Sequence, residues 1–192
     1  MLVLASKSPR RQQILRDAGI PFVVRAADVV EQRRADEGAI DYVRRLAEDK
    51  AFAVPLNSGE VVLGADTTVV VDDQVLEKPR DTADALRMLA LLSGREHQVI
   101  TGICMRWEAR KIVDAAITRV HFVTLAQEEM EAYAASGEPM DKAGAYAIQG
   151  LASKFIDRIE GCYFNVVGLP VPMVYRYWKA HQHWKTHQHQ GS

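Results

Sequence analysis

The chain has 192 residues, of which 48% are hydrophobic and 26% are charged, and its formal net charge is −1. This composition is ordinary for a globular protein and favours one domain or two small ones. The balanced charge argues against a general affinity for nucleic acid or acidic membranes, because nucleic-acid binding needs a basic stripe. Since no signal peptide and no apolar stretch of the ~20 residues that span a bilayer is evident, we expect a cytoplasmic protein.

Strand and helix patterns alternate along the chain. In the first half, the predicted elements are a strand over 2–5, a helix from Pro9, a strand over 22–24, a helix over 40–54, strands over 61–63 and 69–71, and a hairpin strand over 75–76. In the second half, they are a helix over 82–92, strands over 98–107 and 112–123, a helix starting with the capping box Thr124 and Gln127, a strand over 155–159, a loop over 161–168 and a helix from Pro170 to about His181. This interleaving indicates an α/β fold, and the short connections indicate a sheet with parallel and antiparallel pairs. We expect one domain over residues 1–180 and a disordered tail over the His- and Gln-rich residues 181–192.

The segment Ser6-Lys7-Ser8-Pro9-Arg10-Arg11 joins the first predicted strand to the first helix. Ser8 suits the N-cap, and the proline after it suits the first helical position. A helix N-terminus carries free N–H groups and a partial positive charge, so two arginines in its first turn are unfavourable unless an anion binds there. We therefore interpret Ser8, Arg10 and Arg11 as a phosphate site, with a solvated basic turn as the alternative.

Asp66 stands in Gly64-Ala65-Asp66-Thr67-Thr68, between two Val-rich strands. A carboxylate at such a strand end is costly unless it is paired, bound to metal or open to a cleft. Facing a polyphosphate, it can bind a divalent metal or activate a water. If residues 69–71 and 75–76 pair, Lys78 returns toward the level of Asp66 and Thr67. The alternative is a loop aspartate that forms an Asx-turn.

Three further residues are candidates because of their positions. Gln149 lies in a glycine-bounded segment of small residues, where its amide could read the edge of a nucleobase, or it is a surface residue of a packing loop. Lys50 on the second helix could reach phosphate, or it is a surface lysine. Glu31 could be a second metal carboxylate, or it is a solvated loop acid.

Several of these segments occur together in one known family. From Leu2 to about Tyr177 the chain resembles the Maf family of nucleotide pyrophosphatases, once described as septum-formation inhibitors. The matching segments are Leu4-Ala5-Ser6-Lys7-Ser8-Pro9-Arg10-Arg11, Gly64-Ala65-Asp66-Thr67-Thr68-Val69, Leu76-Glu77-Lys78-Pro79-Arg80-Asp81, and residues 45–51, 92–94, 141–150 and 161–170. The resemblance is specific because several distinctive motifs follow one another in the right order.

The resemblance implies a fold and a chemistry. The implied fold is an elongated, twisted mixed sheet flanked by helices, with two lobes around a cleft. The implied reaction is hydrolysis between the α- and β-phosphates of a nucleoside triphosphate with Mg²⁺ or Mn²⁺. By motif position, Asp66 would be the proton acceptor. The acidic pair that the family often has before the second helix is reduced here to Glu31-Gln32, and the expectation that Asp66 and Glu31 hold the metal belongs to the mechanistic hypothesis. Arg10, Thr67 and Gln149 match the positions that set the base preference of the branch that prefers dTTP and UTP.

We therefore predict a hydrolase that converts dTTP, UTP or modified pyrimidine nucleotides to the nucleoside monophosphate and diphosphate. In this hypothesis Arg10, Arg11, Lys50 and Lys78 hold the polyphosphate. The resemblance and the aromatic last helix suggest a homodimer. Two alternatives stay open: a non-catalytic nucleotide-binding regulator of cell division, and a pyrophosphatase of the sister branch that prefers 7-methyl-GTP.

Overall fold

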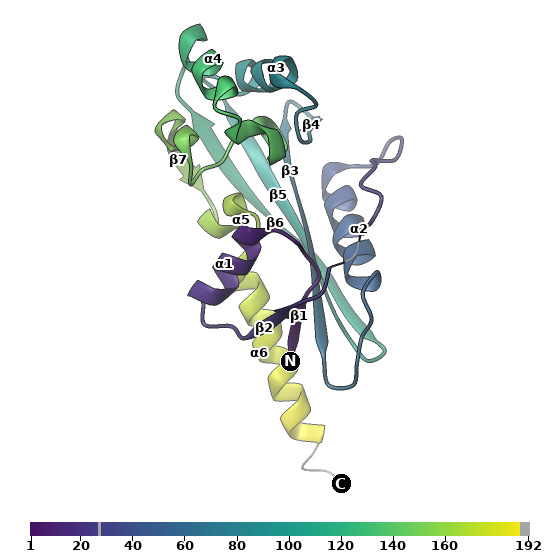
Figure 1. Ribbon diagram of the computed structural model, residues 1–192. Helices are drawn as coiled ribbons and strands as arrows, with labels where there is room; N and C mark the ends of the chain where they lie inside the picture. Colours follow the sequence, from purple (N-terminus) through teal and green to yellow (C-terminus); the bar gives the residue numbers. More distant parts are fainter. Residues whose placement is uncertain (27, 189–192) are drawn as a thin grey trace.

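A computed structural model describes residues 1–26 and 28–188 of the chain. Its elements, in chain order, are β1 (Leu2–Leu4), α1 (Pro9–Asp17), β2 (Phe22–Val24), α2 (Ala39–Phe52), β3 (Val61–Val71), β4 (Gln74–Leu76), α3 (Thr82–Leu92), β5 (Glu96–Trp107), β6 (Arg110–Phe122), α4 (Gln127–Ala135), the 3-10 helices η1 (Glu138–Asp141), η2 (Ala143–Ala145) and η3 (Leu151–Phe155), β7 (Ile156–Glu160), α5 (Tyr163–Val167) and α6 (Val171–Gln188). Figure 1 shows that the long strands β3, β5 and β6 run through an elongated molecule, with helices on both sides.

Within the described residues, seven strands form one mixed sheet. Its order is β2-β1-β3-β5-β6-β7, and β4 pairs with one end of β3. β1 pairs in parallel with β2 and β3, whereas the other pairs are antiparallel. The predicted fold class, an elongated mixed sheet flanked by helices, is confirmed.

The strand β3 differs from the prediction. The two predicted strands over 61–63 and 69–71 belong to one strand of 11 residues, so Asp66 lies in mid-strand and not at a strand end. The reason is that β5 pairs with β3 without interruption from Val62 to Val70. The polar residues 66–68 are therefore part of the same strand.

The other edge of β3 is only partly covered. β1 pairs with residues 61–63, and β4 pairs with residues 69–71, as the predicted hairpin requires. Between them, the edge from Gly64 to Thr68 has no neighbouring strand among the described residues. We call this stretch the open edge of β3.

Two hydrophobic cores lie at the two ends of the long strands and give the molecule two lobes. In one lobe, α3 and α4 cover the sheet, with Leu89, Phe122 and Phe155 fully or almost fully buried. In the other, α1, α5 and α6 pack on β1, β3 and β5 around residues such as Leu63 and Leu169. The open edge of β3 lies between the lobes, because the partner strands β1 and β4 flank it.

The helix α2 lies against the opposite face of the sheet, and two glycines set its distance from the strands. A Cβ atom on Gly64 of β3 would lie 2.1 Å from the carbonyl oxygen of Ala47, and one on Gly102 of β5 would lie 2.3 Å from that of Val43. Only glycine at these positions lets the helix backbone lie so close to the strands. The packing depth of α2 therefore depends on both glycines.

The last helix is longer than predicted. α6 continues to Gln188, whereas the sequence pattern predicts its end at about His181 and a disordered tail beyond that point. His181 is buried and packs on Trp107 and Trp178, with ring centroids 5.0 and 5.9 Å away, so the helix is anchored there. Residues 189–192 of the predicted tail lie outside the described residues. None of the described helices combines the length and the apolar character that crossing a bilayer requires.

Candidate active site

A cavity of about 770 Å³ lies at the open edge of β3. Every residue that the sequence analysis selected for binding or catalysis lines it: Ser8, Arg10, Arg11, Glu31, Lys50, Asp66, Thr67, Lys78 and Gln149. These residues come from α1, α2, β3 and the segments that precede α2, follow β4 and follow η2. The fold therefore brings the selected residues together, while their individual roles stay predictions.

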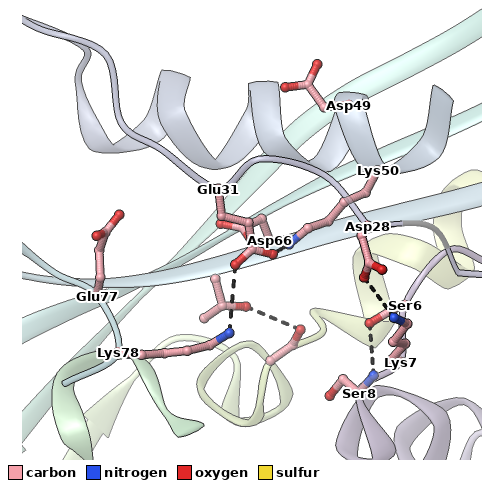
Figure 2. A network of polar contacts seen from close by, with 12 residues as sticks. Ser6, Lys7, Ser8, Asp28, Glu31, Asp49, Lys50, Asp66, Glu77 and Lys78 are labelled. Carbon is pink, nitrogen blue, oxygen red and sulfur yellow. Dashed lines mark hydrogen bonds and ion pairs between the residues drawn. The ribbon is translucent and has the colours of Figure 1, made fainter. Parts of the chain in front are cut away.

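A cluster of two carboxylates and two lysines occupies the side of the cavity that faces α2 (Figure 2). The ammonium group of Lys50 lies between both acids, 2.6 Å from Oδ1 of Asp66 and 2.5 Å from Oε1 of Glu31. Lys78 lies 3.7 Å from Oε2 of Glu31. Although burial alone would raise it, the pKa of Glu31 lies below its ordinary value, because Lys50 and Lys78 stabilise the ionised carboxylate. The cluster thus holds cations and carboxylates in contact, with Lys50 and Asp66 largely buried and with Glu31 and Lys78 open to solvent.

Thr67 faces the other side of the sheet, because consecutive residues of a strand point to opposite faces. There it meets Arg11, whose Nη2 donates to Thr67 Oγ1 at 3.0 Å. Arg11 also donates through Nε to the Gly168 carbonyl at 2.8 Å and through Nη1 to Ser6 Oγ at 3.3 Å. Burial lowers the pKa of this guanidinium, and the nearby Asp66 and Glu31 carboxylates counteract that effect. Three N–H groups of Arg11 therefore donate to other residues of the protein and hold the cavity wall in place.

The N-terminus of α1 opens into the same cavity, as predicted from Ser8 and the proline after it. Ser8 is the N-cap, and its side chain accepts from the Arg11 N–H at 3.4 Å. Arg10 reaches across the cavity toward the other lobe, where its Nη1 lies 3.8 Å from Oδ2 of Asp141. Gln149, also from that lobe, is exposed and lines the cavity. The cavity therefore has a wall on each lobe.

Tyr42 and Glu77 belong to the cavity wall but were not predicted as site residues from the sequence. Tyr42 of α2 donates its hydroxyl to Oε1 of Glu77 at 2.6 Å, and the main-chain carbonyl of Glu77 accepts from the Gly144 N–H at 3.1 Å. Burial, together with the Glu77 carboxylate, raises the pKa of the Tyr42 hydroxyl. Glu77 thus ties α2 and the segment after η1 to the loop that carries Lys78. In the sequence, Tyr42 fits the inward-facing stripe of its helix, and no local signal separates a core tyrosine from one in a cavity wall.

Tyr146 lines the cavity on the side of the lobe covered by α3 and α4 and is held by a buried histidine. Nε2 of His97 lies 2.8 Å from the Tyr146 hydroxyl oxygen, and the His97 ring packs edge-on against Phe122. Burial lowers the pKa of His97 from 6.5 to about 4. The folded protein therefore keeps this imidazole neutral over a pH range in which the unfolded chain binds a proton.

We expect this histidine to make the free energy of unfolding fall as the pH is lowered from 6.5 toward 4. In that window the unfolded state binds more protons than the folded state, so stability decreases by at most about 1.4 kcal/mol per pH unit. Urea unfolding across this range checks the prediction, with His97→Gln as a control without a titrating ring. Equal pH slopes for the two proteins would contradict it.

Comparison with known proteins identifies the family of the chain. The family model described as Maf-like protein matches residues 1–181. The chain belongs to the Maf family. Its resemblance to that family, inferred above from separate motifs, is thus confirmed over nearly the whole length.

Two relatives that are about half identical to this chain are named dTTP/UTP pyrophosphatase. The dTTP/UTP pyrophosphatase of Koribacter versatilis is 51% identical over 176 residues, which cover 91% of each chain. The dTTP/UTP pyrophosphatase of Vibrio cholerae is 53% identical over 172 residues, which cover 88% of this chain and 92% of the relative. Among solved structures, a HAM1 protein from Coxiella burnetii matches 63% of this chain and 72% of its own with a TM-score of 0.40 and 17% sequence identity.

Proposed function

We propose that this Maf protein hydrolyses dTTP and UTP to the nucleoside monophosphate and diphosphate. The observation that carries the proposal is the cavity at the open edge of β3, where a cation–carboxylate cluster and a helix N-terminus lie together. Its volume of about 770 Å³ lies within the range of small-molecule sites. Relatives about half identical to this chain are named dTTP/UTP pyrophosphatase, which supports the choice of substrate.

In this proposal, the polyphosphate binds between α1 and the lysines. The N–H groups at the N-terminus of α1, with the Ser8 hydroxyl and Arg10, hold its outer oxygens. Lys50 on α2 and Lys78 on the segment after β4 approach it from the carboxylate cluster. Arg11 adds positive charge but acts mainly through the wall residues to which it donates. These cations stabilise the charge that develops on the phosphate oxygens as the anhydride bond breaks.

We assign the activation of water to Asp66. Its carboxylate lines the cavity, and one oxygen, Oδ1, accepts from Lys50. That hydrogen bond holds the carboxylate in place, so Oδ2 can orient a water for in-line attack on phosphorus and accept its proton. The diphosphate then leaves from the side of the cationic residues.

The two carboxylates of the cluster are suitable ligands for a divalent metal ion, but they are too few to hold the ion without substrate. Carboxylate oxygens are the ligands that Mg²⁺ and Mn²⁺ prefer, and Mg²⁺ usually takes one or two of them together with substrate phosphates. The described residues contain no group of three or more acids, histidines or cysteines that would hold an ion without substrate. We therefore propose Asp66 and Glu31 as the protein ligands of an ion that enters with the nucleotide and offsets the negative charge of its phosphates.

We assign the recognition of the base to the uncharged polar groups of the cavity, Thr67 and Gln149. Both can form hydrogen bonds with the edge of a pyrimidine, and neither belongs to the ionic cluster around Lys50. Thr67 lies on the open edge of β3 and Gln149 on the segment after η2, and both line the one cavity in which the base would bind.

We expect the purified protein with Mg²⁺ to release nucleoside monophosphate and diphosphate, fastest from dTTP or UTP. Separation of the products from a panel of nucleoside triphosphates, including 7-methyl-GTP, measures this result. Release of inorganic phosphate with nucleoside diphosphate would contradict the proposed bond cleavage. Binding without any release would support the regulator of cell division instead, and a preference for 7-methyl-GTP would support the sister branch. The cytoplasmic location and the homodimer stay predictions.

A further inference from the structure

A row of hydrogen bonds runs from Arg11 at the cavity through Thr67 on β3 and Thr101 on β5 to Asn165 on α5. Nη2 of Arg11 donates to Thr67 Oγ1 at 3.0 Å, and this oxygen lies 2.9 Å from Thr101 Oγ1 on β5. Thr101 in turn donates to the main-chain carbonyl of Asn165 at 3.2 Å. Thr101 and Asn165 are both 0% exposed, so water does not compete for the bond between them, whereas the bonds of Thr67 are partly buried. Of the two threonines, only Thr67 lines the cavity.

The two ends of this row fix the direction of every proton in it. A guanidinium has donors and no acceptor, and a main-chain carbonyl has acceptors and no donor. Because Thr101 gives its only hydroxyl proton to the Asn165 carbonyl, it can only accept from Thr67. Thr67 therefore gives its own proton to Thr101 and accepts from Arg11.

One other acceptor lies near the Thr67 hydroxyl but does not change this assignment. The Gly168 carbonyl is 3.4 Å from Thr67 Oγ1, longer than the 2.9 Å to Thr101. It already accepts from Nε of Arg11 at 2.8 Å. A hydroxyl oxygen accepts two hydrogen bonds and donates one, so Thr67 keeps one vacant lone pair and no proton for a ligand.

We propose that this row makes Thr67 an obligate acceptor and thereby selects bases that present a ring N–H. The inference rests on the proposed function, because it requires the base to lie against Thr67. Uracil and thymine carry a hydrogen on N3, whereas N3 of cytosine carries a lone pair. A uracil N3–H would satisfy the vacant lone pair of Thr67, but cytosine would place two lone pairs against each other. Thr101, which does not line the cavity, is then a positioning residue for base selection.

The test replaces Thr101 by valine, which removes the hydroxyl and keeps a branched side chain of similar size. Without Thr101 Oγ1, the Thr67 proton loses its nearer acceptor and keeps only the distant Gly168 carbonyl, so it becomes available to a ligand. We expect the ratio of kcat/KM for UTP to that for CTP to fall by about 10-fold or more, mainly through KM, because base recognition acts in the ground state as well. UTP and CTP have the same ring size, so a general loosening of the cavity does not predict this change.

Two matched variants separate proton direction from packing. Thr101→Ser keeps the hydroxyl and should keep the wild-type ratio. Thr118→Val removes another fully buried hydroxyl, on β6, which bonds to Cys162 and to the Asn165 side chain but not to Thr67. It should lower the thermal midpoint of unfolding without changing the ratio.

A further measurement needs no variant. N3-methyl-UTP lacks the ring N–H, so the wild-type protein should hydrolyse it with a kcat/KM about 10-fold or more below that for UTP. Equal hydrolysis of UTP and N3-methyl-UTP, or a folded Thr101→Val protein with the wild-type ratio, would overturn the inference. Failure of the proposed function gives a different result, because the wild-type protein would then release no diphosphate from UTP.

Discussion

Replacing Asp66 by asparagine is expected to lower kcat for dTTP by about 10²-fold or more, because the amide cannot accept the proton of the attacking water. The asparagine oxygen can still accept from Lys50 Nζ, so the cluster with Glu31 should keep its arrangement. KM should therefore change much less than kcat. Steady-state measurement of diphosphate release, together with direct binding of dTTP, checks both parts.

The matched control for this change is Asp49→Asn. Asp49 precedes Lys50 on α2, but its carboxylate points away from the cavity (Figure 2) and pairs with Arg45 on the surface. The control should keep wild-type kcat. An Asp66→Asn protein with wild-type turnover would exclude Asp66 as the proton acceptor and require another group of the cavity for that role.

Replacing Gly64 by alanine is expected to lower the free energy of unfolding by about 3 kcal/mol, at the upper end of the usual cost of overpacking. The added Cβ would overlap the carbonyl oxygen of Ala47, and a main-chain atom of a helix cannot move away alone. The helix α2 must then shift as a whole, which moves Lys50 relative to Asp66. We therefore expect a loss of activity as well, even though Gly64 itself is not assigned a catalytic role.

Urea unfolding and diphosphate release measure the two effects of the Gly64→Ala change. Gly38→Ala is the control, since Gly38 caps the same helix with φ −64°, and its added Cβ would meet nothing closer than 3.8 Å. The control should lose at most about 1 kcal/mol through the poorer cap. If Gly64→Ala were as stable and active as this control, the close packing of α2 would not position the site.

Local sequence patterns predicted much of the fold because their physical causes are local. The Ser8 cap and the proline after it mark the start of α1, and the pairing of residues 69–71 with β4 follows from a hairpin turn. The selection of Asp66 and Lys78 as neighbours rested on that hairpin, and both line the cavity. Position alone made Glu31 and Gln149 candidates, and for Gln149 the family resemblance then added the implied role in base preference.

Features that depend on distant partners were not predicted. β3 is continuous because β5 pairs with it on both sides of Asp66. The local pattern contains no sign of this partner, so the polar residues around Asp66 suggested a break between two strands. The helix α5 falls in a segment predicted as a loop. The predicted capping box of Thr124 and Gln127 is shifted, since Glu129 caps the N–H of Ala126 instead.

The same limit applies to side chains of the site. Arg11 stands beside Arg10 in the sequence, but it turns inward to Thr67 and Gly168, which are 56 and 157 residues away. Thr101 and its proton acceptor Asn165 are 64 residues apart. No spacing rule connects such positions, because strand order and packing bring them together.

The open edge of β3 also bears on the resistance of the fold to aggregation. An unpaired strand edge is a template on which another chain can add a strand and start aggregation. Here the unpaired stretch ends at β1 on one side and at β4 on the other, so an incoming strand finds only the length from Gly64 to Thr68 before it collides with existing partners. Charged side chains such as Lys50 and Glu31 surround the gap and would have to give up their solvation and ion pairs to a foreign strand. An opening of this length admits a small anion and resists intermolecular pairing.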